Sequence, residues 1–334
     1  MPQLNKTSSG DNPVGKASSS KAIAGDRKGR RTEFVIASVV IVLILIIIGA
    51  SLYRNAAPFR RTVITVDDTS INMDYFLKRT KLAGADPTVM LGVLTDEQLI
   101  KIEAPRYVAE VSPEDVDQEL RKIASRKSKT ISESEFKELY RQLLNETGLS
   151  DSEYKEFIAT NLLATRLHEY LAERVPTVTE QVNVHAILLD TEDMDKIWEK
   201  VDEGEDLNKL TITTEIWQDK QSEGKVNDLG WLPRGVLGSG FDQVAFNLTI
   251  GDVSAPLLVG KLSQTEESDY FIITVSEKAD AREVNEDSLQ TLKAKALDDW
   301  LLKEKKFHEI GWHGLKNGFN SETYAWINWQ LSKK

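Results

Sequence analysis

The chain has 334 residues, a formal net charge of −11 and no cysteine. This length is sufficient for two domains, and the lack of cysteine excludes disulfides, thiolate metal sites and cysteine nucleophiles. The four histidines are scattered along the chain, so we expect neither a bound metal nor a cofactor.

The N-terminal 61 residues differ from the rest of the chain in composition. Residues 1–33 are rich in Ser, Gly and Lys and are expected to form a disordered tail. Residues 34–53 carry no charge, and twenty residues in a helix span roughly 30 Å, the thickness of a bilayer core. No signal-peptide cleavage pattern follows this run, so we predict an uncleaved transmembrane anchor.

Charge predicts how the anchor is oriented. Residues 1–33 contain seven Lys or Arg against three acidic residues, which predicts a cytoplasmic tail and an extracytoplasmic bulk. Residues 1–61 carry ten basic and three acidic side chains, so the remainder of the chain carries a net charge of −18. A region this acidic repels a phosphate backbone, and nucleic-acid binding is therefore not expected.

Residues 62–176 have mainly helical periodicity. VITVD (63–67) is a candidate short strand, and Ser112-Pro113 has the pattern of a helix N-terminus. Ser132 with Glu135 and Ser150 with Glu153 are predicted to form capping boxes for two further helices, the second running to about residue 174.

Residues 181–278 alternate between strand and helix patterns. Strands are predicted at 182–189, 253–259 and 269–275, helices around Met194–Val201, around Leu207–Leu210 and at 241–248, and a long polar loop at 213–235. A closing helix is predicted at about 286–309. The tail that follows, 311–334, contains three tryptophans. These could form a client-binding patch or a belt at the membrane interface, but we favour docking of the tail onto the helical segment.

Three motifs in the second half occur in a specific order. They are NDLGWLPRG (227–235), FDQVAFNL (241–248) and GDVSAPLLV (251–259). Together they resemble the parvulin-type peptidyl-prolyl isomerase family, whose pattern reads roughly GGDLGW-x-x-x-G, F-x-x-A-F-x-L and G-x-V-S-x-P. The anchor, helical segment and closing helix resemble in layout the membrane-anchored foldases of the SurA and PrsA type.

The resemblance implies a fold of the α+β class. It implies a parvulin-like domain with an antiparallel sheet and surrounding helices over 181–278. It also implies an all-α chaperone-like domain over 62–176, against which the helix at 286–310 packs, all preceded by one transmembrane helix.

The family's chemistry needs no nucleophile. The barrier to rotation about an X–Pro bond is roughly 18–20 kcal/mol, and a site accelerates the rotation if it binds the twisted amide better than the planar forms. The resemblance implies an apolar slot for the proline ring at Leu237 and Phe241, with Trp231 and Phe271 as further substrate contacts. Ordinary core packing is the alternative for Leu237 and Phe241.

The resemblance also implies polar positions. Asp219 is the nearest match to a polar family residue in the loop before GGDLGW, one residue further away than is usual, and a solvated Asp is the alternative. Asp228 is expected to serve the turn. The two family histidines fall on Ala186 and Phe271, and His185 sits one residue early, where strand alternation turns it to the other face. His185 would be catalytic only if a bulge re-aims it.

These observations predict a membrane-anchored extracytoplasmic foldase whose isomerase domain binds proline-containing segments of unfolded polypeptides. The replaced histidines imply weak catalysis. The alternative is a degenerate isomerase domain that acts only as a holdase or scaffold, and assembly with another membrane protein through the anchor is a third hypothesis. The sequence does not define the clients or the oligomeric state.

Overall fold

The computed structural model describes residues 56–125, 132–189, 191–204, 212–260 and 269–333, together with four isolated residues before them. The chain divides into two compact units, Met1–Arg60 and Arg61–Lys334. The anchor predicted at 34–53 and the helix predicted around Leu207–Leu210 lie largely outside the described residues. Within the part of the chain that is described, no helix has the length and apolar character needed to cross a bilayer.

The first unit is represented by the short 3-10 helix η1 (Ala57–Arg60). The second unit begins with the predicted strand, β1, and the helices that follow it. These elements are β1 (Thr62–Val66), β2 (Thr69–Asn72), α2 (Met73–Ala83), α3 (Pro87–Glu103), η2 (Ala104–Arg106), α4 (Pro113–Ser125), α5 (Glu133–Thr147) and α6 (Asp151–Ala172).

The predicted capping boxes set the starts of α5 and α6. Ser132 accepts the Glu135 backbone N–H and Glu135 accepts the Ser132 N–H, and Ser150 and Glu153 repeat the arrangement. Such reciprocal bonds satisfy backbone donors that a helix N-terminus otherwise leaves unpaired. These predictions are confirmed.

The helical segment is not all-α, as the resemblance had implied. Strand β1 pairs antiparallel with β2 and with β7 (Ile310–Trp312), giving a three-stranded sheet of order β2-β1-β7. The all-α description is wrong because β1 pairs with β7, which lies almost 250 residues later in the chain. No local sequence pattern indicates this pairing. After β7, helix α11 (Ser321–Leu331) contacts α2 and α3, and the Trp312 indole donates to Thr95 Oγ1 at 3.1 Å.

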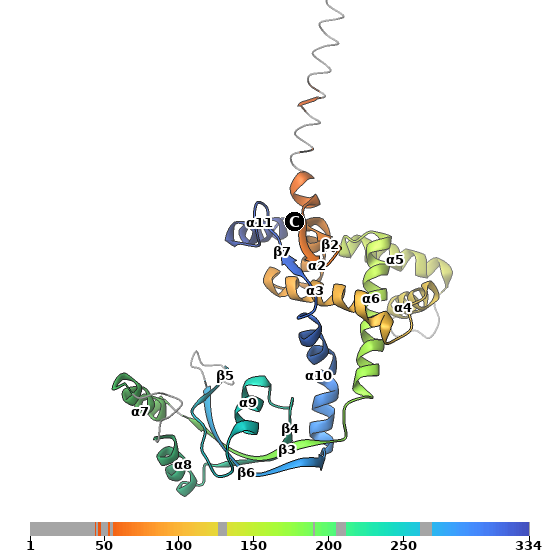
Figure 1. The fold of residues 1–334 in the computed structure, drawn as a ribbon. Helices are drawn as coiled ribbons and strands as arrows, with labels where there is room; N and C mark the ends of the chain where they lie inside the picture. The colour runs from red at the N-terminus through yellow and green to blue at the C-terminus, as the bar shows by residue number, and fades with distance from the viewer. Residues whose placement is uncertain are drawn as a thin grey trace, which may run out of the picture. The chain divides into compact units, whose positions relative to one another are not determined.

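The remaining elements build a four-stranded antiparallel sheet of order β4-β3-β6-β5 (Figure 1). In chain order they are β3 (Val178–Leu189), α7 (Thr191–Asp202), α8 (Ile212–Ser222), β4 (Asn227–Pro233), α9 (Ser239–Asn247), β5 (Leu257–Gly260) and β6 (Asp269–Glu283). The closing helix α10 (Glu286–Glu304) then packs against α6.

The predicted polar loop at 213–235 is wrong, because α8 and β4 lie within it. Helix α8 buries only Ile216, Trp217 and Lys220 among its described side chains, and the Lys220 ammonium lies 2.8 Å from the Asp193 carboxylate. Two buried apolar side chains are too few to give this segment a recognisable helical hydrophobic periodicity, so the sequence did not indicate a helix. The predicted combination of helices with an antiparallel sheet over 181–278 is confirmed.

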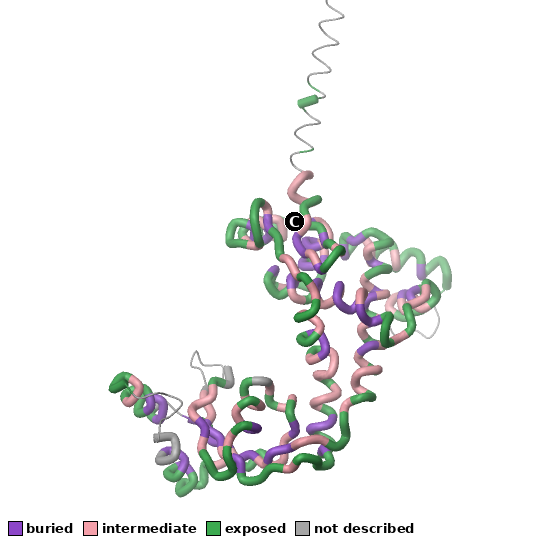
Figure 2. Tube along the Cα trace, viewed as in Figure 1, coloured by how far each residue is buried: buried purple, intermediate pink, exposed green. Residues whose placement is uncertain are grey.

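The sheet has an apolar core on each face (Figure 2), and its buried positions lie between 181 and 189 in β3 and at Ile272, Ile273 and Val275 in β6. We call the side covered by α9 the α9 face; its buried residues are Val182, Val184, Ala186, Ala245, Phe246, Ile273 and Val275. The opposite face, covered by α7 and α8, buries Ile187, Leu189, Met194, Ile197, Ile216, Trp217 and Ile272. Adjacent residues of β3 therefore serve different cores.

Candidate active site

Two aromatic rings lie on the α9 face. Phe241 of α9 and Phe271 of β6 are both partly buried and pack against the same cluster as Ala186. Leu257 of β5 pairs with Phe271 and belongs to this cluster as well. Leu237 precedes α9 and is 44% exposed. Phe241 is thus not sealed in the interior.

The loop before α9 is held from two sides. The Asp242 carboxylate accepts the Gly235 backbone N–H at 2.7 Å. The Lys295 ammonium of α10 donates to the carbonyl oxygens of Gly235 at 3.1 Å and Val236 at 2.7 Å. Burial raises the pKa of Asp242, against the effects of the Gly235 N–H and of nearby Arg234 and Lys295. These contacts fix the backbone that leads into Leu237 and Phe241.

Close packing at Gly235 supports the same loop. Its φ is +96°, and a Cβ built there would lie 2.9 Å from Leu292 Cδ2 of α10. The positive φ favours glycine at this position, and a Cβ would in addition displace the end of the Leu292 side chain.

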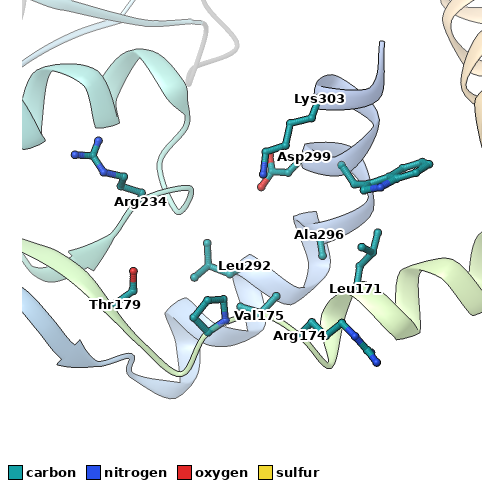
Figure 3. Close-up of a pocket in the computed structure, with 11 residues that line it drawn as sticks. Leu171, Arg174, Val175, Thr179, Arg234, Leu292, Ala296, Asp299 and Lys303 are labelled. Carbon is teal, nitrogen blue, oxygen red and sulfur yellow. The ribbon is translucent and has the colours of Figure 1, made fainter. Parts of the chain in front are cut away.

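A cavity of about 360 Å³ lies on the α10 side of this loop (Figure 3). Leu171, Val175, Leu292, Ala296 and Trp300 supply its apolar lining. Its lining includes neither Leu237 nor Phe241. Arg234 also lines the cavity, and its guanidinium extends away from Leu292 (Figure 3), lying 3.8 Å from the centre of the Phe246 ring.

Asp228 bonds to the nearby backbone, as predicted, but it lies at a bulge within strand β4 and not in a turn. Its Oδ1 accepts the Gly230 backbone N–H at 2.8 Å, and Gly230 has a φ of +69°. The same bond, between an Asp side chain and the backbone two residues on, is common in turns.

His185 lies on the face opposite to α9. Its neighbours Val184 and Ala186 both belong to the α9-face core, whereas its Nε2 lies 3.2 Å from Ser276 Oγ and its Nδ1 3.5 Å from Asp228 Oδ1. Register shifts next to His185 do occur, between Val184 and His185 against β4 and between Asn183 and Val184 against β6. They do not bring the imidazole to the α9 face.

Asp219 and Trp231 are not brought together with Phe241. Asp219 is exposed on α8, whose buried Ile216 and Trp217 belong to the opposite core. In β4 it is Leu232 that packs on the α9 face, and the adjacent Trp231 ring instead lies under the Arg282 guanidinium at 4.3 Å. Of the predicted site residues, the structure gathers Phe241 and Phe271 on one cluster and leaves Leu237 exposed just before α9.

Three residues that position this site were missed by sequence reasoning: Asp242, Lys295 and Ser254. Ser254 is 2% exposed, accepts the Ile273 N–H at 3.0 Å and donates to the Ala255 carbonyl at 2.8 Å. It ties the segment before β5 to β6. The position of Ser254 in the GDVSAP motif could have indicated its role. Lys295 could not be recognised in this way, because the packing of α10 against the loop produces no local sequence pattern.

Comparison with known proteins agrees with the resemblance stated above. Residues 190–277 match the family model of the PPIC-type PPIASE (rotamase) domain. The chain therefore carries a parvulin-type peptidyl-prolyl cis-trans isomerase domain, and the predicted enzyme class is confirmed.

Curated relatives extend the match beyond this domain. The foldase protein PrsA of Halalkalibacterium halodurans is 24% identical over 259 residues, covering 73% of each chain. PrsA of Geobacillus kaustophilus is 24% identical over 236 residues, covering 67% of this chain and 73% of the relative. The solved structure of PrsA from Bacillus anthracis covers 72% of this chain and 95% of its own, with 20% identity and a TM-score of 0.31. The chain is thus similar to PrsA foldases over about 73% of its length, and it carries a parvulin domain.

Proposed function

We propose that this protein is a membrane-anchored extracytoplasmic foldase whose parvulin domain binds proline-containing segments of unfolded polypeptides on the α9 face. The observation that carries the proposal is that Phe241 and Phe271, both partly buried, pack on one cluster, with the exposed Leu237 two residues before α9. An apolar surface of this kind can accept a five-membered ring while excluding water, which favours the less polar, twisted amide. The uncharged run at 34–53 supplies the anchor in this proposal.

The helical segment is proposed to hold unfolded clients. Val89 and Val93 lie four residues apart on α3 and are 58% and 39% exposed, and Leu82 of α2 is 39% exposed. Residues at this spacing share one side of a helix. Apolar surface left open in this way suits transient contact with exposed hydrophobic chain.

A holdase without isomerase turnover is the second candidate function. It is favoured by the α9 face itself, where Ala186 and Phe271 occupy the positions at which the family histidines are expected and where His185 does not reach. Binding depends on shape and apolar area and would survive this loss. Catalysis would lose any hydrogen-bond network that depends on imidazole.

A protease-coupled assay on short X-Pro peptides, run with the full-length chain, distinguishes an active isomerase from a holdase. We expect a rate above background that falls at least about tenfold in Phe241→Ala, since burial of a Phe-sized surface is worth ~1.5–3 kcal/mol. Phe307→Ala is the matched control, because Phe307 is 80% exposed and lies outside the parvulin domain. A rate at background assigns the holdase function, and a rate untouched by Phe241→Ala removes the proposed site.

Client binding is tested separately by suppression of aggregation of a chemically unfolded protein. The double change Val89→Ser and Val93→Ser should weaken suppression without changing peptide isomerisation. Leu302→Ser, at a 61% exposed residue of α10, is the control. Equal suppression by all three proteins would refute a role for the α3 surface.

A further inference from the structure

Carboxylates and one imidazole converge where two helices end. Glu103 is the last residue of α3 and Glu304 the last of α10, and His308 follows four residues after Glu304. Asp67, in the turn between β1 and β2, completes the group. The donor atoms of Glu103, Glu304 and His308 all lie within 4.8 Å of one another.

Asp67 orients the His308 ring. The His308 Nδ1 lies 2.6 Å from Asp67 Oδ2, and the Glu309 backbone N–H holds the other oxygen of Asp67 at 2.9 Å. The Asp67 carboxylate is therefore placed to accept the Nδ1 hydrogen of the imidazole. In the neutral imidazole the lone pair is then on Nε2. Nε2 lies 3.6 Å from Glu103 Oε1 and 4.0 Å from Glu304 Oε2.

This group carries an excess of negative charge, which a bound cation would neutralise. The side chains of Glu103, His308 and Glu304 are only 4%, 9% and 19% exposed, so water screens them poorly. Both glutamates stand at helix C-termini, where the backbone itself carries partial negative charge. Arg106 pairs with Glu103, but its own side chain is 70% exposed. Without a further positive charge, the Nε2 lone pair would face two carboxylates.

The Nε2 separations of 3.6 Å from Glu103 and 4.0 Å from Glu304 are too long for hydrogen bonds, and the three ligands would move closer together on a bound ion. With metal–ligand bonds of about 2.0–2.1 Å, neighbouring ligands of a tetrahedral zinc ion lie about 3.3 Å apart, and wider angles give longer separations. An imidazole whose second nitrogen is held by a carboxylate is the usual form of a metal-binding histidine.

We infer that His308 Nε2 and one oxygen each of Glu103 and Glu304 bind a divalent transition-metal ion of the Zn²⁺ type, with Asp67 as the supporting carboxylate. Three protein ligands leave a position for water. The ion would join the ends of α3 and α10 to the β1–β2 turn, and this role is independent of the isomerase site. Sequence reasoning missed the group because its members come from three separate segments.

The test is a titration of the full-length chain, stripped of metal with EDTA and freed of chelator, with Zn²⁺ alone. Calorimetry should show one saturable site per chain, and the thermal midpoint should rise on saturation. Glu304→Gln keeps the size of the side chain and the His308–Asp67 bond, and it should weaken binding by at least ~10-fold, as should Asp67→Asn. His308→Gln should abolish the site.

Glu309→Gln is the matched control, because it removes the same charge from an exposed residue next to His308. It should bind Zn²⁺ as the unchanged chain does. Absence of a saturable site, or equal affinity in Glu304→Gln and the unchanged chain, would overturn the inference. The group would then be a metal-free cluster of hydrogen bonds and ion pairs.

Discussion

The Lys295 ammonium lies 2.7 Å from the carbonyl oxygen of Val236, so a helix outside the matched isomerase region holds a loop inside that region, the one that leads into α9. The same ammonium reaches the Gly235 carbonyl at 3.1 Å. Helix α10 also packs against α6 of the helical segment. The geometry of the candidate active site therefore depends on residues that a minimal parvulin domain would lack.

Replacing Lys295 by Met should impair isomerisation without unfolding the domain. The methionine keeps the length of the side chain but cannot donate to the two carbonyls, and a hydrogen bond from a charged donor contributes ~1.5–3 kcal/mol. We expect kcat/KM on X-Pro peptides to fall by about threefold to tenfold. Lys306→Met, at an exposed lysine beyond the end of α10, should leave it unchanged. Equal values for the two variants would mean that the loop holds its conformation unaided.

Gly235→Ala should destabilise the protein by about 1–3 kcal/mol, because a left-handed φ is costly for a residue with a Cβ. The new methyl group would also meet Leu292 Cδ2 at 2.9 Å. Combining Gly235→Ala with Leu292→Ala removes the contact but not the backbone cost. Gly240→Ala is the control, since a Cβ at that position would meet no atom within 4 Å and the φ of Gly240 is not positive. Denaturant unfolding measures all four proteins, and equal losses at the two glycines would contradict this account.

The sequence predicted elements whose signals are local. Capping residues located α5 and α6, and apolar runs located β3 and β6. It failed where stability comes from distant partners. Strand β7 has only three residues and exists because β1 offers a free edge. Helix α8 is held by a short apolar stripe and the buried Lys220–Asp193 pair, which no periodicity reveals.

The candidate site was predictable to a similar extent. The alternation of strand residues correctly assigned Ala186 to the α9 face and His185 to the other, because period two is fixed by backbone geometry. The same rule, applied to β4, would have separated Trp231 from Leu232. The support from Lys295 and Asp242 depends on tertiary packing and had no comparable signal.

His185→Ala should leave kcat/KM within about twofold of the unchanged chain. The ring contacts Ser276 and Asp228 on the face away from Phe241. Loss of these partly exposed contacts should cost about 1 kcal/mol or less of stability. Peptide isomerisation and denaturant unfolding give the two readouts. A loss of activity above tenfold with unchanged stability would show that the imidazole acts in catalysis.

Asp242→Asn tests the cost of burying a carboxylate beneath the loop. Burial raises the pKa of Asp242 in the folded protein, so the folded state binds this proton more tightly than the unfolded chain. The resulting stability is present below the unfolded pKa of about 3.9 and is lost as pH rises through the folded value. The amide oxygen of the variant can still accept the Gly235 N–H. The free energy of unfolding of the unchanged chain, relative to Asp242→Asn, should therefore fall between pH 4 and pH 7. A relative stability that rises with pH would mean that Lys295 and Arg234 outweigh burial, and that the loop is held by ion pairing.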